Sequence, residues 1–275
     1  MSHLFMEANK IITLTTDFGL VDPYVSEMKA VILSISPNAR IVDITHNISK
    51  FNIRMGAFIL ASALTYFPKG TIHVAVVDPG VGSHRRPLLI ETNKGFLIGP
   101  DNGLLILAAE KQGIKRVHEL TNKKLMLNRV SNTFHGRDIF APAAAYLLNG
   151  VAPLTFGPQT NELNKPVFTK VIKTRKSLFG QVMHVDDFGN IITNIDLDTS
   201  YQDLYGKMLK INMSSSKLIL KFCKTYSEVQ LGELLVTIGS HGFLEISANQ
   251  NNAGKMLNIQ SGDKITVTIP SQTII

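Results

Sequence analysis

Hydrophobic positions in the first part of the chain alternate between strand and helix spacing. The run IITLTT at 11–16 is rich in β-branched residues and predicts a strand. From Tyr24 the apolar residues keep helical spacing until Pro37, and Asp22 and Pro23 predict the helix start as N-cap and first-turn residue. Such alternation is typical of a mostly parallel sheet with helices packed on it. The same rhythm predicts further elements at 39–44, 52–66, 73–78, 95–99, 104–111 and 135–150.

The pattern changes near residue 165, after which short apolar runs are separated by Gly, Asn, Ser and Asp. Runs of this kind predict an antiparallel sheet or a small barrel. They are expected at 177–186, 207–214, 217–225, 233–239, 243–248 and 263–270. We therefore expect a disordered start at 1–10, an α/β domain at 11–165 and a smaller all-β domain at 166–275.

The composition is that of an ordinary globular protein, with 44% hydrophobic and 18% charged residues in 275. The longest apolar runs stop well short of the roughly 20 residues that span a bilayer, so we expect no membrane segment. The net charge of +7 comes from scattered basic residues, which argues against a nucleic-acid partner. Cys223 is the only cysteine, so no intrachain disulfide can form, and we expect a cytoplasmic protein.

Acidic residues follow three of the predicted strands. Asp17, Asp43 and Asp78 each stand at a strand end, and ligands of open α/β sheets bind outside the carboxyl ends of the strands. Each carboxylate alone is equally well explained as a helix cap or a turn residue. Together with His135 and Asp138 before the last predicted helix of this domain, they indicate the rim of an active site.

Several common chemistries find no support in the motifs. Gly80 and Gly82 are followed by Arg85 where the nucleotide-binding pattern GxGxxG needs its third glycine. Neither a Walker-type lysine nor a GxSxG nucleophile elbow occurs. The carboxylates and the histidine of the rim are metal-ligand types, but the sequence has no close pair such as HxH or HxxxH. We therefore expect no metal site.

Motifs in both predicted domains occur in the order found in one enzyme family. They are TTDFG, DPY, IVDITHNI, GAFIL, FPKGTIHVAVVDPGVGSHRRPL, IGPDNGLL, TFHGRDIFAPAAA and DDFGNIITNI. From about residue 11 to 265 they resemble the S-adenosyl-L-methionine hydroxide adenosyltransferases, relatives of the fluorinating and chlorinating enzymes that attack the same substrate. So many motifs in sequence make this resemblance specific.

The resemblance implies an α/β domain followed by a β domain, and a reaction in which water splits S-adenosylmethionine into adenosine and methionine. It further implies a homotrimer with its sites between neighbouring subunits, and no metal or organic cofactor. The hydrolytic branch of the family is marked by an Asp, Arg and His set, which falls here on Asp78, Arg85 and His135.

This set suits the chemistry of the reaction. A sulfonium is already a good leaving group, whereas water is a weak nucleophile that must be aligned with C5′ opposite the sulfur. His135 could accept or relay the water proton, with Asp78 and Arg85 fixing its orientation and charge. Which group takes the proton stays open at this point. A purely structural ion pair between Asp78 and Arg85 is the alternative.

The resemblance also assigns contacts with the substrate. Asp17 would accept hydrogen bonds from the 2′ and 3′ hydroxyls of the ribose. In the second domain Phe188 would stack on adenine, Asn190 would bind the adenine edge or the methionine end, and Asp186 would face the substrate ammonium. A plain hairpin turn is the alternative for these three residues. A further binding segment, SHGFLEISA, adds Ser240, Glu245 and the backbone of Ala248.

Two departures from the family pattern and two rival functions remain. Asn52 stands where many members carry an acid, and Asn251 and Asn252 replace a small Gly/Ser pair, so the fine shape of the pocket is open. A halide-using adenosyltransferase is the first rival, against which His135 and the absence of an extra loop in the first domain argue. The second is a non-catalytic sensor of the same ligand, which only the Asp, Arg and His set distinguishes from an enzyme.

Overall fold

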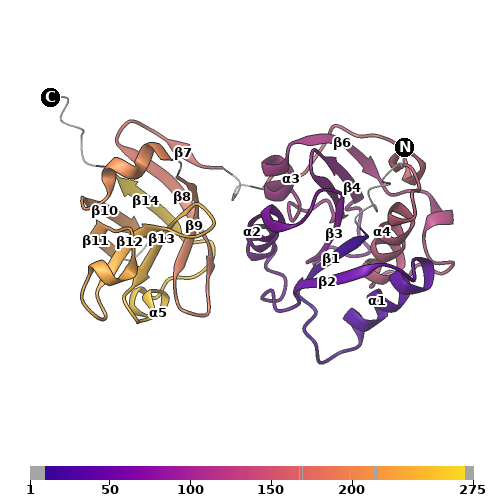
Figure 1. Cartoon of the computed structure of the whole chain (residues 1–275), viewed down its shortest axis with the longest axis horizontal. Coiled ribbons are helices and arrows are strands. Elements are labelled where there is room, and N and C mark those ends of the chain that lie inside the picture. The colour runs from indigo at the N-terminus through magenta and orange to yellow at the C-terminus, as the bar shows by residue number, and fades with distance from the viewer. Residues whose placement is uncertain (1–9, 167, 169, 198, 214–215, 270–275) are drawn as a thin grey trace, which may run out of the picture. The chain divides into compact units, whose positions relative to one another are not determined.

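The computed structural model describes residues 10–166, 168, 170–197, 199–213 and 216–269. Contacts divide the chain into two compact units, Met1–Lys165 and Pro166–Ile275, which form the first and second domains (Figure 1). Of the expected start at 1–10, residues 1–9 lie outside the described residues.

A mixed sheet forms the centre of the first domain. In the described part of the chain it has six strands in the order β2-β1-β3-β5-β4-β6. The strands are β1 (Ile11–Thr16), β2 (Arg40–Thr45), β3 (Thr71–Val76), β4 (Pro87–Thr92), β5 (Gly95–Pro100) and β6 (Ile114–Glu119). The pairs β1–β2, β1–β3 and β3–β5 are parallel, whereas β4 runs antiparallel to β5 and β6. The predicted α/β class is confirmed.

Helices cover both faces of this sheet, α1 and α4 on one side and α2 and α3 on the other (Figure 1). Because strand side chains alternate between faces, Leu14 packs in the core with Met28 of α1, while Ala75 packs in the opposite core with Leu60 of α2. The helical segments are α1 (Tyr24–Ile35), α2 (Ile53–Ala63), η1 (Leu64–Tyr66), α3 (Ile106–Gln112), η2 (Lys123–Leu125), the π-helical turn η3 (Gly136–Phe140), α4 (Ala141–Leu148) and η4 (Pro153–Phe156).

Two details of this domain differ from the sequence prediction. The expected cap of α1 by Asp22 is wrong: Pro23 occupies the N-cap position and no side chain caps the helix. The backbone oxygen of Pro23 instead accepts the first helical hydrogen bond, from the N–H of Glu27. The sequence does not predict β4 and β6. Strand β6 lies at the edge of the sheet, and its first three residues are exposed, which hides the apolar alternation.

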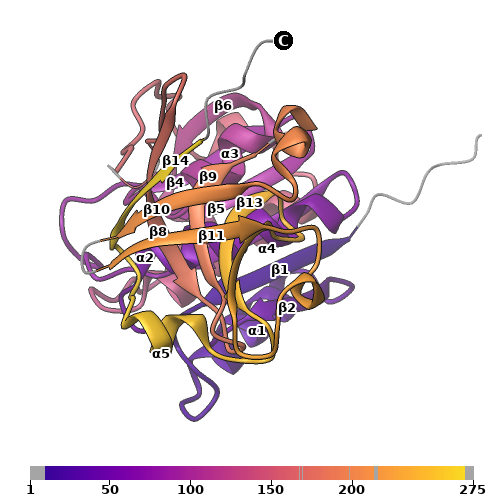
Figure 2. The same cartoon turned by 90° about the vertical axis from the view of Figure 1, so that its left-hand side faces the viewer.

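A closed barrel forms the second domain (Figure 2). Among its described residues the strand order is β14-β10-β11-β12-β13-β9-β8-β7, and β14 also pairs with β8, which closes seven strands into a ring. All pairs are antiparallel except β11–β12. The predicted β domain is therefore confirmed. Its elements are β7 (Ile172–Lys173), β8 (Ser177–Val185), β9 (Ile191–Asp196), η6 (Thr199–Leu204), β10 (Met208–Met213), β11 (Ser216–Phe222), η7 (Tyr226–Glu228), β12 (Leu234–Ile238), β13 (Phe243–Ala248), α5 (Ala253–Leu257) and β14 (Lys264–Thr268).

The register of β1 and β3 determines where two of the acidic residues leave the sheet. Thr16 lies beside Val76 in the parallel pair β1–β3. Asp17 and Asp78 follow these positions, so both emerge at the carboxyl edge of neighbouring strands, where open α/β sheets bind ligands.

Candidate active site

Arg85 joins a carboxylate and a histidine in the first domain. Its Nε lies 3.1 and 2.9 Å from the two carboxylate oxygens of Asp78, and its Nη2 also donates to Oδ2 of Asp78. The same Nη2 lies 2.8 Å from Nδ1 of His135. The side chains of Arg85 and Asp78 are only 8% and 4% exposed. The fold thus brings together the three residues that the sequence singled out for catalysis.

The turn that returns Arg85 to Asp78 depends on Gly82. This glycine has φ 75°, and a Cβ built on it would lie 2.2 Å from the backbone oxygen of Asn132. A side chain is therefore excluded both by conformation and by space. Gly82 therefore allows the glycine-rich turn to pack closely against Asn132, in the loop that leads to His135.

Asp138 anchors the loop that precedes His135. Its carboxylate is fully buried and accepts hydrogen bonds from the N–H of Ser131 at 2.8 Å and from Nε of Arg137 at 2.7 Å. Burial alone would raise the pKa of Asp138, but these two donors lower it below its ordinary value. Asp138 is therefore a charged structural anchor, a role that its position in the sequence did not reveal.

The protonation state of His135 follows from its neighbours. Burial and the positive charge of Arg85 lower the pKa of His135 below its ordinary value, against the smaller effects of Asp78 and Asp138. A guanidinium only donates hydrogen bonds, so Nδ1 of His135 must accept from Arg85. The neutral ring then carries its proton on Nε2. His135 is therefore oriented as a hydrogen-bond donor at its remaining nitrogen.

Asp17 is held at the end of β1 by the segment before α2. The residue is 6% exposed, and its Oδ2 accepts the backbone N–H of Phe51 at 2.8 Å. Nζ of Lys50 lies 2.5 Å from the backbone oxygen of Asp17. Phe51 adopts φ 65°, and its side chain is largely exposed. Sequence reasoning missed Lys50 and Phe51, because a left-handed phenylalanine leaves no signal in a sequence pattern.

Aromatic contacts link the loop of Asp17 to the loop of His135. The rings of Phe18 and Phe134 meet edge to face with centroids 5.6 Å apart. Since these residues directly follow Asp17 and precede His135, the two loops lie together. Asp17 therefore belongs to the same edge of the domain as the Asp78, Arg85 and His135 cluster.

Two other polar positions at this edge have structural roles. Asp43 binds Nζ of Lys29 on α1 at 2.5 Å and is partly exposed. Asn52 caps α2, with its side chain accepting the N–H of Met55 at 3.0 Å. Asparagine at this position therefore serves as a helix cap. Among the described residues, no group of three His, Cys, Asp or Glu side chains could hold a metal ion.

In the second domain, Asp186 orients Asn190 within the turn between β8 and β9. One carboxylate oxygen of Asp186 accepts the N–H of Asn190 at 2.8 Å and the other accepts its Nδ2 at 2.9 Å. Phe188, at the tip of the same turn, is 82% exposed. The turn packs on α5, where Gly189 at φ 90° leaves room for Asn252, the N-cap residue of that helix. Asn252 thus supports the shape of the turn.

The segment with Ser240, Glu245 and Ala248 runs along β13. In the antiparallel pair β9–β13, Ile246 lies beside Ile191 and Phe243 beside Asp196. The buried Ala248 is therefore at the end of β13 nearest the turn of Asn190, whereas the exposed Ser240 precedes the opposite end. Glu245 lies between them and is buried. Ala248 accordingly lies near the turn of Asn190, whereas Ser240 is separated from that turn by the length of β13.

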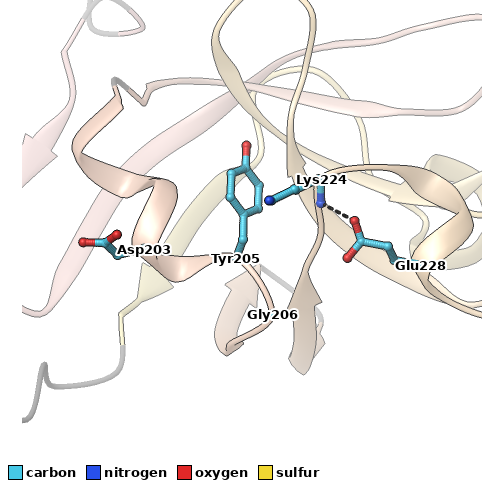
Figure 3. A pocket seen from close by; sticks show the side chains of 5 residues that line it. All are labelled: Asp203, Tyr205, Gly206, Lys224 and Glu228. Carbon is cyan, nitrogen blue, oxygen red and sulfur yellow. Dashed lines mark hydrogen bonds between the residues drawn. The ribbon is translucent and has the colours of Figure 1, made fainter.

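A shallow hollow on the barrel touches none of the predicted site residues. It is lined by Asp203, Tyr205, Gly206, Lys224 and Glu228 (Figure 3). Glu228 accepts the backbone N–H of Lys224 at 2.9 Å, the contact drawn in Figure 3, and so belongs to the cap of η7. Part of the lining of this hollow thus serves the cap of η7.

Comparison with known proteins agrees with this arrangement. A model of the SAM hydroxide adenosyltransferase N-terminal domain matches residues 12–157, and a model of the C-terminal domain of the same family matches residues 180–266. The chain belongs to this family. Both predicted domains are thus covered by one family description, and the resemblance seen in the motifs is confirmed.

Individual relatives match the chain over nearly its whole length. An (R)-S-adenosyl-L-methionine hydrolase of Methanocaldococcus jannaschii is 43% identical over 94% of this chain and 95% of its own. A crystal structure of an uncharacterized conserved protein from Thermotoga maritima matches with a TM-score of 0.86 and 36% identity, covering 93% of this chain and 99% of that one. A fluorinase of an Actinoplanes species is 25% identical over 94% of this chain and 98% of its own. No helix in the described part of the chain has the length and apolar character needed to cross a membrane.

Proposed function

We propose that the protein hydrolyses S-adenosyl-L-methionine to adenosine and L-methionine. The observation that carries the proposal is the bridge that Arg85 makes between Asp78 and His135. The relative from Methanocaldococcus jannaschii is named for this reaction and is 43% identical to the chain. The name of that relative specifies the (R) form of the substrate, so we include the sulfonium configuration in the proposal.

The reaction depends on a correctly positioned nucleophile more than on a general acid. An oxygen of water or hydroxide forms a bond to C5′ while the C5′–S bond breaks, and the electron pair leaves with sulfur as the neutral thioether of methionine. When water is the nucleophile, one of its protons stays on the new 5′-hydroxyl and the other is released to solvent. Catalysis therefore rests on positioning and on stabilising the charge of the nucleophile.

The protonation states at the cluster favour a hydroxide-like nucleophile. Nη1 of Arg85 is buried without a hydrogen-bond partner among the described residues, and the free nitrogen of neutral His135 is a donor. Two donors stabilise an oxygen with negative charge better than they stabilise neutral water. His135 in this tautomer orients the nucleophile by donation, and Asp78 balances the charge of Arg85.

The remaining predicted residues would bind the substrate. Oδ2 of Asp17 holds the N–H of Phe51, whereas its Oδ1 has no hydrogen bond to a described residue, which suits the ribose hydroxyls. The exposed ring of Phe188 suits stacking on adenine. Asn190, already oriented by Asp186, has its amide oxygen left for the ligand. Ser240 and the backbone of Ala248 complete the proposed set.

Separate incubations with the (R) and (S) sulfonium forms in the presence of EDTA test the reaction. We expect adenosine and methionine in equal amounts, with the (R) form turned over at least as fast as the (S) form. Ligand binding without adenosine release from either form would instead support the sensor. A 5′-halo-5′-deoxyadenosine as the main product at high chloride would support the halide-using alternative, which the similarity to a fluorinase motivates.

We also propose a cytoplasmic homotrimer with sites formed between neighbouring subunits. The support is the family resemblance, the spread of proposed ligand residues over two domains, and the single cysteine. Analytical ultracentrifugation should give about three times the 30.3 kDa chain mass. Mixed subunits carrying Asp17→Ala or Asn190→Ala, each inactive alone, should regain activity. Absence of complementation despite proven subunit exchange would exclude the shared site.

A further inference from the structure

His46, the residue that directly follows β2, is buried next to the loop of Asp17. The residue is 4% exposed. Its Nδ1 lies 2.8 Å from Oγ1 of Thr16, the last residue of β1. Its Nε2 lies 3.1 Å from Oδ1 of Asp43, close enough for an electrostatic contact, although this nitrogen makes no hydrogen bond with a described residue. The reaction proposed above assigns no role to this histidine.

The neighbours of His46 determine the direction of its hydrogen bond with Thr16. An ionised carboxylate carries only acceptors, so the proximity of Asp43 favours the tautomer of His46 that has its proton on Nε2. Nδ1 then accepts the hydroxyl of Thr16. The oxygen of the same hydroxyl accepts the backbone N–H of Phe18 at 3.2 Å. Thr16 therefore links His46 to the chain on the far side of Asp17.

A backbone contact joins His46 to the same loop. The backbone oxygen of His46 accepts the N–H of Gly19 at 2.8 Å. Gly19 adopts φ 73°, which turns the chain directly after Phe18. The two residues that follow Asp17 are therefore both held by hydrogen bonds that lead to His46. One of these connections runs through its side chain, so a substitution of His46 removes it and leaves the other.

A second histidine of this sheet makes a similar contact away from the loop of Asp17. Nδ1 of His73 on β3 lies 2.8 Å from Oγ1 of Thr13 on β1, and His73 is buried. Burial lowers the pKa of His73 to about 3, so this ring is neutral. Thr13 lies within β1, whereas Thr16 is its last residue. The pair of Thr13 and His73 therefore belongs to the interior of the sheet.

We propose that His46 is a positioning residue for the ribose contact of Asp17. Its side chain holds the hydroxyl of Thr16, which holds the N–H of Phe18, and this fixes the direction in which the chain leaves β1. The N–H of Phe51 restrains the carboxylate at Oδ2, so the backbone and the side chain of Asp17 are held separately. The inference rests on the proposed function, in which Oδ1 of Asp17 accepts the ribose hydroxyls.

The test compares the binding of adenosine and of 2′,3′-dideoxyadenosine, which lacks both ribose hydroxyls, by calorimetric titration of the full chain. For the wild type we expect adenosine to bind on the order of 100-fold more tightly, because the analogue loses hydrogen bonds to a carboxylate. His46→Leu removes the polar atoms of the ring and should reduce this ratio to below about 10-fold. His46→Asn can place its amide oxygen near the position of Nδ1 and should keep the ratio within about threefold of the wild type.

His73→Leu serves as the matched control, because it removes the corresponding contact with Thr13. It should lower the free energy of unfolding in urea but keep the ratio of the wild type. Thr16→Val removes the hydroxyl while keeping the shape of the side chain. It should reduce the ratio as His46→Leu does, and it carries the test should that variant not fold.

Three results would overturn the inference. They are an unchanged ratio in the folded His46→Leu or Thr16→Val variant, an equal loss in His73→Leu, and a wild type that does not distinguish the two nucleosides. Adenosine release from S-adenosylmethionine is measured separately. A wild type that shows the expected ratio but releases no adenosine would refute the proposed reaction and still support the role of His46.

Discussion

Replacing Arg85 by lysine separates charge from geometry at the proposed catalytic cluster. Lysine keeps one positive charge but has a single nitrogen, whereas Arg85 uses Nε and Nη2 to hold Asp78 and Nη2 to hold Nδ1 of His135. The variant therefore cannot maintain both contacts with the geometry of a planar guanidinium. His135 loses the donor that fixes its tautomer.

The size of the effect follows from the hydrogen bonds that lysine cannot make. A hydrogen bond to a charged group contributes about 1.5–3 kcal/mol, and about 1.4 kcal/mol corresponds to a tenfold change in rate. Loss of one such bond in the transition state predicts a fall in kcat of about 10- to 150-fold for Arg85→Lys. KM should change little, because Arg85 contacts Asp78 and His135 and not the proposed ligand residues.

The assay measures adenosine release by chromatography at saturating substrate, with thermal unfolding as a check of folding. Arg86→Lys is the matched control, since the neighbouring Arg86 binds Asp101 at 2.6 Å and takes no part in the cluster. We expect this control to keep wild-type kcat. A folded Arg85→Lys enzyme with kcat within about threefold of the wild type would refute the role given to the guanidinium, since the smallest expected fall is about tenfold.

Three further predictions concern protonation and local structure. Burial and Arg85 lower the pKa of His135 from 6.5, so the folded state resists protonation of this ring. The contribution of His135 to the free energy of unfolding is therefore complete above pH 6.5 and falls as the pH decreases. We expect kcat to fall in the same direction. Urea unfolding and initial rates from about pH 5 to 8 check this, and a free energy of unfolding that does not fall below pH 6.5 would contradict it. Gly82→Ala, with its Cβ 2.2 Å from Asn132, should lower stability by about 2 kcal/mol or more and reduce kcat, as measured by urea unfolding and adenosine release. Asn52→Ala removes the cap on the N–H of Met55 and should cost about 1 kcal/mol with little change in kcat; an unchanged unfolding midpoint would argue against the cap.

Much of the fold could be predicted because its central elements carry strong periodic signals. Strand β1 is fully apolar or β-branched, and α1 places Val25, Met28 and Ile32 on one buried face. Closure of the barrel could not be predicted in this way. It depends on the pairing of β14 with β8, which joins segments far apart in the sequence and is set by the curvature of the whole sheet.

At the site, the sequence predicted the set of Asp78, Arg85 and His135 but not the roles of the residues around it. Asp138 has the same appearance in the sequence as Asp78, yet one is an anchor beneath the loop and the other faces Arg85. Asn252 caps α5 beside Gly189, a role that its place in the sequence did not show. Such differences arise from burial and tertiary contacts, which a local pattern does not contain.

Arg85 and Arg86, which follow the glycine-rich turn, have different partners although they are neighbours in the chain. Arg86 belongs to the ladder of β4 and β5, because its backbone oxygen accepts the N–H of Asp101. Successive side chains of a chain entering a strand point to opposite sides, so when Arg86 reaches Asp101, Arg85 turns to Asp78. A change of one residue in the length of the turn would exchange these directions. The length of the turn, which packs at Gly82 against Asn132, therefore decides which of the two arginine side chains reaches Asp78.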